Sequence, residues 1–129
     1  MDLSIEVRDD YLFSTVSGRL SLSEALEIYK RVLDASAEKA LGKVLFDCLA
    51  VEGELPLLQR YELGKAMAEY GVSRSIMPKI AVIGLSPTIT GFAAKVAWNR
   101  GLVVEVFSDR QAALVWLNSF RSRTTILLD

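Results

Sequence analysis

The sequence contains no histidine and a single cysteine among its 129 residues. Without histidine, a Ser-His-Asp triad, a Cys-His dyad, an HExxH zinc site and an imidazole general base are all impossible. The lone Cys48 excludes Cys-rich zinc sites, CxxC redox chemistry and an internal disulfide. Glycine loops of the GxGxxG and GxxxxGK[ST] types are also missing. We therefore expect a non-enzyme with no metal site and no cofactor.

A strong net charge and long apolar runs are lacking as well. Fifteen basic and sixteen acidic residues leave a net charge of -1, and the basic residues are scattered along the chain. A nucleic-acid-binding protein needs a concentrated basic surface, so we expect no nucleic-acid partner. The apolar runs are far shorter than the roughly 18 residues that cross a bilayer. Acidic residues stand where a signal peptide would be basic, which favours a cytoplasmic protein that does not span a membrane.

The length and composition are those of one globular domain. Hydrophobic residues make up 51% and charged residues 24% of the chain, as in ordinary folded domains. There is no internal repeat and no linker rich in Pro, Gly or Ser. We expect a single domain over residues 1–120, followed by a C-terminal tail over 121–129.

Strand and helix patterns alternate along the chain. Two runs with a period near two, at residues 3–7 and 11–16, flank a polar turn and predict a β-hairpin. Nearly continuous apolar runs predict three further, buried strands at 43–50, 79–85 and 102–107. Helical periodicity predicts four helices, which begin near Ser21, Pro56, Ser86 and Ser108. The predicted order is ββαβαβαβα.

Capping signals indicate the helix starts. Ser21 and Glu24 have capping-box spacing, as do Ser108 and Gln111. Ser86 followed by Pro87 is typical of an N-cap and a first-turn proline, with the helix ending at Arg100-Gly101. Periodicity assigns the inner face of the second helix to Leu57, Leu58, Tyr61, Lys65 and Ala68. It assigns that of the last helix to Ala112, Val115, Trp116 and Phe120, and Trp98 is expected in the core as well.

These elements predict an α/β domain with a mixed sheet of about five strands, parallel in its centre and packed with four helices. The order, together with the stretches KVLFDCLA, KIAVIGL, FAAKVAWNRG and VEVFSDRQAALVWL, resembles the STAS/SpoIIAA-like family, especially its small bacterial branch. The resemblance covers roughly residues 3–120. It implies a non-catalytic regulatory or protein-interaction module with a protein partner.

One part of the family pattern is missing. In phosphorylatable STAS domains a serine or threonine follows the central strand and opens the next helix. The corresponding stretch here, DCLAVEGEL at 47–55, contains no hydroxyl residue. We therefore do not transfer the phosphorylation switch to this chain. The resemblance places the partner surface around the second helix, with Asp47, Glu52, Glu54, Arg60 and Tyr61 as candidates.

A weaker candidate site lies at the end of the second buried strand. In open α/β sheets, ligands bind at the carboxyl ends of the strands. Free amides at a helix start near Ser86, with hydroxyls nearby, could hold an anion, and a glycine would allow close approach. The candidate residues are Ser86, Thr88, Thr90 and Gly91. The alternative is plain capping by Ser86 with solvated threonines.

Two alternatives to a regulatory module remain open. The first is a small-ligand or lipid-binding protein with an apolar pocket between sheet and helices. The second is an enzyme, which would have to use Asp47, Cys48, Tyr61 or the hydroxyls of residues 86–90. For Cys48, a buried thiol that packs as a small hydrophobe is favoured over a thiolate nucleophile. Glu52 and Glu54 could in principle do acid–base work, but a solvated turn is favoured.

The tail over 121–129 ends in the β-prone run Thr-Thr-Ile-Leu-Leu. It could dock on the domain, pair with a second copy in a homodimer, or be a disordered end. The sequence leaves these alternatives open.

Overall fold

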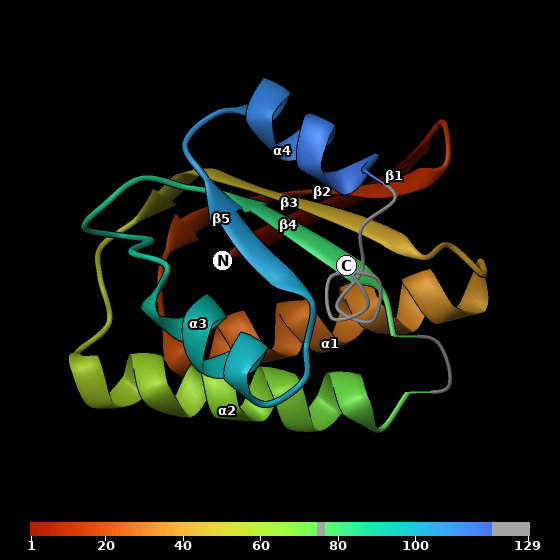
Figure 1. The fold of residues 1–129 in the computed structure, drawn as a ribbon. Helices are drawn as coiled ribbons and strands as arrows, with labels where there is room; N and C mark the ends of the chain where they lie inside the picture. The colour runs from red at the N-terminus through yellow and green to blue at the C-terminus, as the bar shows by residue number, and fades with distance from the viewer. Residues whose placement is uncertain (75–76, 120–129) are drawn as a thin grey trace.

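The computed structural model describes residues 1–74 and 77–119 (Figure 1). Its elements, in chain order, are β1 (Asp2–Arg8), β2 (Tyr11–Arg19), α1 (Leu22–Glu38), β3 (Lys43–Glu52), α2 (Leu57–Val72), β4 (Lys79–Ile83), α3 (Phe92–Asn99), β5 (Val104–Phe107) and α4 (Arg110–Leu117). The predicted order ββαβαβαβα is confirmed. The predicted tail over 121–129 and its possible docking or pairing lie outside the described residues.

The five strands form one sheet in the order β1-β2-β3-β4-β5. The β1–β2 hairpin is antiparallel, and the other three pairings are parallel. Parallel neighbours need long crossover connections, and α1, α2 and α3 provide them. The mixed sheet with a parallel centre is therefore confirmed.

Helices cover both faces of the sheet, with α4 on one face and α1, α2 and α3 on the other (Figure 1). Successive strand residues point to opposite faces, so β3 contributes to two cores. Val44 and Phe46 belong to the larger core beneath α1, whereas Leu45 packs in a smaller core with Ala113 and Leu117 of α4. No helix of the described residues is long and apolar enough to cross a membrane.

The helix α2 lies outermost and packs on α1 and α3 (Figure 1). Its buried residues include Gly64, Met67, Ala68 and Gly71. A Cβ atom built on Gly64 would lie 2.3 Å from the Ala93 carbonyl oxygen, so the missing side chain is what allows α2 to approach α3 closely.

The predicted inner face of α2 is therefore largely wrong. Leu57 and Leu58 are 65% and 67% exposed, and Tyr61 is 38% exposed. Of the residues assigned to that face, Ala68 is buried. The prediction failed because it followed large apolar side chains, whereas the contact with α3 is made by glycine.

The start predicted for the third helix is also wrong, since α3 begins at Phe92 with Gly91 as its N-cap residue. Gly91 has a φ of 86°, a conformation that glycine adopts without strain. The preceding residues form a loop in which Ile89 packs against Gly84. The packing of Ile89 against Gly84 thus overrides the capping preference of Ser86 and Pro87.

The last helix begins one residue later than the capping box predicted. The side chain of Asp109, not Ser108, accepts a 2.8 Å hydrogen bond from the Ala112 amide. The inner face then contains Ala113 and Leu117, whereas Val115 is 69% exposed.

Neither tryptophan is fully buried, whereas the first helix begins at the expected cap. Trp98 and Trp116 are half-buried rather than fully in the core, and Phe120 lies outside the described residues. At the first helix, the predicted cap is confirmed, because Ser21 accepts from the Glu24 amide.

Candidate functional site

Asp47 lies within β3, on the face covered by α4. Its Oδ1 accepts a 3.1 Å hydrogen bond from the Leu49 amide, and its Oδ2 lies 3.6 Å from the Arg110 guanidinium. The side chain is 18% exposed. Asp47 therefore links the middle of β3 to α4, because β3 continues past it to Glu52.

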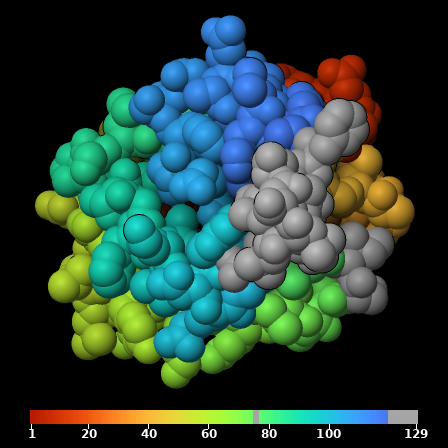
Figure 2. Space-filling view, viewed as in Figure 1, coloured from red at the N-terminus to blue at the C-terminus, as the bar shows by residue number. Residues whose placement is uncertain are grey.

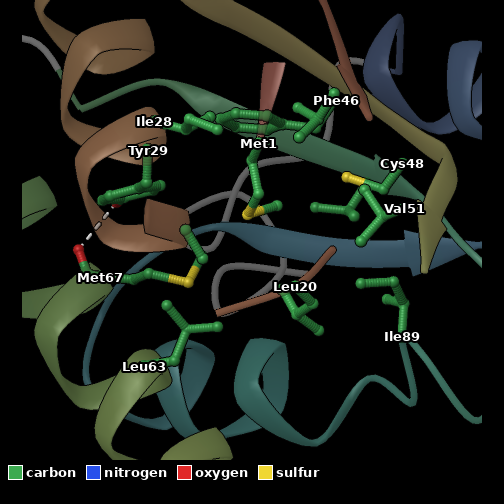
Figure 3. A pocket seen from close by; sticks show the side chains of 13 residues that line it. Met1, Leu20, Ile28, Tyr29, Phe46, Cys48, Val51, Leu63, Met67 and Ile89 are labelled. Carbon is green, nitrogen blue, oxygen red and sulfur yellow. Dashed lines mark hydrogen bonds between the residues drawn. The ribbon is translucent and has the colours of Figure 1, made fainter. Parts of the chain in front are cut away.

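Cys48 points to the opposite face, into the space between the sheet and the helices (Figure 3). Burial raises the pKa of the Cys48 thiol to about 12, and the neighbouring Asp47 carboxylate acts in the same direction. The thiol is thus protonated near neutral pH. This favours the interpretation of Cys48 as a small hydrophobe over a thiolate nucleophile.

Arg60 joins two groups of predicted residues that are far apart in the sequence. Its guanidinium donates to the Leu55 carbonyl (2.7 Å), the Glu54 carboxylate (3.1 Å), the Thr90 hydroxyl (3.3 Å) and the Pro87 carbonyl (3.4 Å). The start of α2 is thereby tied to the loop before α3. Sequence reasoning placed Glu54 and Arg60 at one site and Thr90 at another, and the fold brings the three together.

The exposed side of α2 carries two apolar side chains, Leu57 and Leu58, and a tyrosine, Tyr61, that contacts an arginine. Arg100, the C-cap residue of α3, donates a 2.7 Å hydrogen bond to the Tyr61 hydroxyl, with its guanidinium 5.6 Å from the ring centroid. Leu57, Leu58 and Tyr61 are neighbours on one side of the helix because residues three and four apart share a face. We call these three residues the α2 surface. Sequence reasoning missed the two leucines as surface residues.

The remaining predicted residues lie in loops or at strand ends. Glu52 is exposed at the end of β3, and its carbonyl accepts from the Leu20 amide at 2.9 Å. Ser86 is exposed and Thr88 half-buried in the loop. Because α3 starts at Phe92, the helix-start amides invoked for an anion site near Ser86 do not exist there. A ligand role for Ser86, Thr88, Thr90 and Gly91 stays a prediction.

An apolar cavity of about 110 Å³ lies between the sheet and the helices. Its walls come from β2, β3, β4, α1, α2 and the loop before α3 (Figure 3). The residues that line it are Met1, Val16, Leu20, Ala25, Ile28, Tyr29, Phe46, Cys48, Val51, Leu63, Met67, Val82 and Ile89. The cavity can accept an apolar group but offers little hydrogen bonding, because the Tyr29 hydroxyl is already bonded to the Met67 carbonyl.

A second hollow, of about 520 Å³, lies at the surface between α3 and β5. The space-filling view shows the surface sunken between these two elements (Figure 2). Its walls mix polar and apolar residues, namely Ile89, Thr90, Gly91, Ala94, Lys95, Trp98, Val104, Glu105 and Val106. We call it the α3–β5 groove.

Within residues 1–74 and 77–119, no three Cys, Asp or Glu side chains gather in a way that could hold a metal ion.

Two solved structures resemble this one over nearly its whole length. An anti-sigma factor antagonist from Mycobacterium paratuberculosis matches with a TM-score of 0.63 at 15% identity, over 92% of this chain and 94% of that chain. A DUF3478 family protein with a SpoIIAA-like fold from Shewanella loihica PV-4 matches with a TM-score of 0.54 at 24% identity, over 90% and 92% of the two chains. No protein-family model and no curated protein matches the sequence.

The chain therefore has the SpoIIAA-like α/β fold, and the predicted fold class is confirmed. Identities of this size establish the fold alone, because one fold serves many functions.

Proposed function

We propose that this protein is a non-catalytic regulatory module of the cytoplasm that binds another protein through the α2 surface and the charged residues around it. The fold supports this proposal, because one structure that shares it is an anti-sigma factor antagonist. The chemistry supports it as well, because the sequence has no histidine and the Cys48 thiol is held protonated.

The exposure of Leu57 and Leu58 is the observation that carries the proposal. Both side chains are about two-thirds exposed at the start of α2. Fully burying a leucine in an interface is worth about 1.5–3 kcal/mol. Tyr61 and the Glu54–Arg60 ion pair lie close by in the chain, which gives the apolar centre and polar rim typical of protein interfaces.

In this proposal, partner binding is regulated without phosphorylation of the stretch that follows the central strand. From Lys43 to Arg60, which spans β3, the following loop and the first turn of α2, the chain has no serine, threonine or tyrosine. Glu54 occupies the loop and is paired with Arg60. We propose that partner binding depends on shape and fixed charge in this region.

The test compares three baits in affinity capture from a lysate of the source cells. The variant Leu57→Asp/Leu58→Asp places charges on the α2 surface, and Val115→Asp places one on α4, where Val115 is 69% exposed. A true partner is retained by the wild type and by Val115→Asp but lost with the double variant. Recovery of the same proteins by all three baits would contradict the proposal.

A second candidate function is the binding of a small apolar ligand in the cavity beside Cys48. Its apolar lining favours it, since ligand sites are commonly concave and mostly apolar. Xenon is a suitable probe because it enters dry apolar cavities. Xenon pressure should shift the amide resonances of Phe46 and Cys48, and unchanged resonances there would contradict a ligand role for the cavity.

A further inference from the structure

Ile89 separates the apolar cavity from the α3–β5 groove, because it lines both of them. The neighbouring strands β4 and β5 are divided between the cavity and the groove in the same way. Val82 of β4 lines the cavity and Val106 of β5 lines the groove, and these two residues are direct neighbours in the sheet register. One side chain thus stands between the cavity and the groove.

Ile89 reaches this position because Gly84 has no side chain. A Cβ built on Gly84 would lie 2.5 Å from Cβ and Cγ1 of Ile89. The Ile89 amide also donates a 2.9 Å hydrogen bond to the Leu85 carbonyl, which closes the loop into a turn. The close-up shows Ile89 entering from this loop, across the cavity from α2 (Figure 3).

Arg60 holds the loop on both sides of Ile89. Its guanidinium donates to the Pro87 carbonyl and to the Thr90 hydroxyl, which flank Ile89 in sequence. The same guanidinium also donates hydrogen bonds to the Leu55 carbonyl and the Glu54 carboxylate, in the segment just before α2. The contacts to Pro87 and Thr90 are the longer ones, at 3.4 and 3.3 Å, against 2.7 Å for Leu55 and 3.1 Å for Glu54.

We propose that Ile89 is a gate held by Arg60, and that its displacement joins the cavity and the groove into one elongated site for an unbranched, neutral amphiphile. The proposal rests on the apolar-ligand function given above as the second candidate. The tail of the amphiphile lies in the inner cavity, and its polar head lies in the groove.

The size of the cavity selects the shape of the tail. At about 110 Å³, it is smaller than the ~150 Å³ cavity known to accept benzene. A narrow alkyl end therefore fits, and an aromatic ring does not. The groove, at about 520 Å³, has the size of ordinary ligand sites, roughly 300–1,000 Å³, and takes the remainder of the molecule.

The charges of the groove select a neutral head. Lys95 and Glu105 lie on its walls, so the formal charges of the groove cancel. A charged head would lose hydration without a net opposite charge to replace it. A hydroxyl or amide head can bond to either side chain and loses less.

The gate is tested through Cys48, the only cysteine of the sequence and a wall residue of the cavity. Methyl methanethiosulfonate, a small neutral reagent, labels the thiol at a rate that mass spectrometry follows. The variants Ile89→Ala and Ile28→Ala remove the same atoms from the same cavity, one at the gate and one on α1. We expect labelling at least tenfold faster in Ile89→Ala than in Ile28→Ala. Equal rates would mean general loosening and would overturn the gate.

A second pair of variants tests the hydrogen bonds from Arg60 to the loop without changing the cavity. Arg60→Gln should speed labelling of Cys48 severalfold, whereas Arg100→Gln, which removes a comparable contact between α3 and α2, should leave the rate unchanged. Equal effects of the two substitutions would remove Arg60 from the mechanism.

Ligand class is tested with octan-1-ol on the wild-type protein. The alcohol should shift amide resonances on both sides of the gate, at Cys48 in the cavity and at Lys95 and Val106 in the groove, and octanoate and octylammonium should bind at least tenfold more weakly. Shifts on one side alone would overturn the joined site, and tighter binding of either ion would overturn the neutral head. The xenon experiment distinguishes failure of the gate from failure of the apolar-ligand function. If xenon enters the cavity while the gate tests fail, the apolar-ligand function stands and the gate does not.

Discussion

The hydroxyl of Tyr29 on α1 donates a 2.7 Å hydrogen bond to the carbonyl oxygen of Met67 on α2. Both residues are buried and both line the apolar cavity. Because α2 packs on α1 and α3, this bond is one of the specific links between α2 and the rest of the domain. Burial raises the pKa of the Tyr29 hydroxyl well above its ordinary value, so the donor keeps its proton at physiological pH.

Replacement of Tyr29 by phenylalanine should lower the free energy of unfolding by about 1 kcal/mol, the usual value of a buried hydrogen bond. Urea denaturation measures the loss. Tyr70→Phe is the matched control, because Tyr70 also links the two helices through Asp34 but does so in an exposed position. A loss in Tyr70→Phe equal to that in Tyr29→Phe would contradict the importance assigned to the buried bond.

The contact between α2 and α3 depends on the absence of a side chain at Gly64. Gly64→Ala should lower the free energy of unfolding by about 3 kcal/mol, because the new Cβ would meet the Ala93 carbonyl oxygen, a backbone atom that cannot turn aside. Gly42→Ala is the control, since a Cβ there has no neighbour within 4 Å. Thermal denaturation of the two variants should therefore differ widely, and equal melting temperatures would show that the helices adjust without cost.

The fold could be predicted from the sequence, whereas the α2 surface could not, and Gly64 is part of the reason for the second outcome. Element order and strand burial follow from apolar periodicity, which is visible in runs such as 43–50 and 79–85. The inner face of α2 is instead defined by glycine and alanine, which carry little hydrophobic signal. Leu57 and Leu58 were therefore assigned to the core, although they are exposed.

The loop before α3 escaped prediction for a related reason. Ser86-Pro87 is a good local helix start, but the local preference competes with the packing of Ile89 against Gly84 and with the hydrogen bonds from Arg60. The hydrogen bonds from Arg60 join residues 27 and 30 positions apart, and no local pattern reports them. The apolar cavity was predicted as an alternative, whereas its boundary at Ile89 required the structure.

The start of α4 provides a direct test of the corrected cap. Asp109→Ala should lower the free energy of unfolding by about 1 kcal/mol, the typical value of an N-cap side chain, because the Ala112 amide loses its acceptor. Ser108→Ala should change the stability by less than about 0.5 kcal/mol, as for most surface substitutions. The opposite order of the two effects in chemical denaturation would restore the capping box expected from the sequence.

The stability of the protein should fall at alkaline pH because of Cys48. Its pKa is about 12 in the folded protein and about 8.5 in an unfolded chain. The folded state therefore holds the thiol proton more tightly, so this stabilisation is complete below about pH 8.5 and is lost as the pH rises toward 12. At about 1.4 kcal/mol per pH unit, the loss between pH 8.5 and 10 reaches at most about 2 kcal/mol.

Urea denaturation at pH 7.5 and pH 10 measures this loss, with Cys48→Ala as the comparison. The alanine variant should be less stable than the wild type at pH 7.5, because it enlarges the cavity, yet it should lose less stability between the two pH values. Tyr29 remains in both proteins, and its raised pKa contributes equally to each. A parallel fall in the two proteins would mean that the Cys48 thiol ionises as freely in the fold as in the unfolded chain, and the cavity wall would then be open to water.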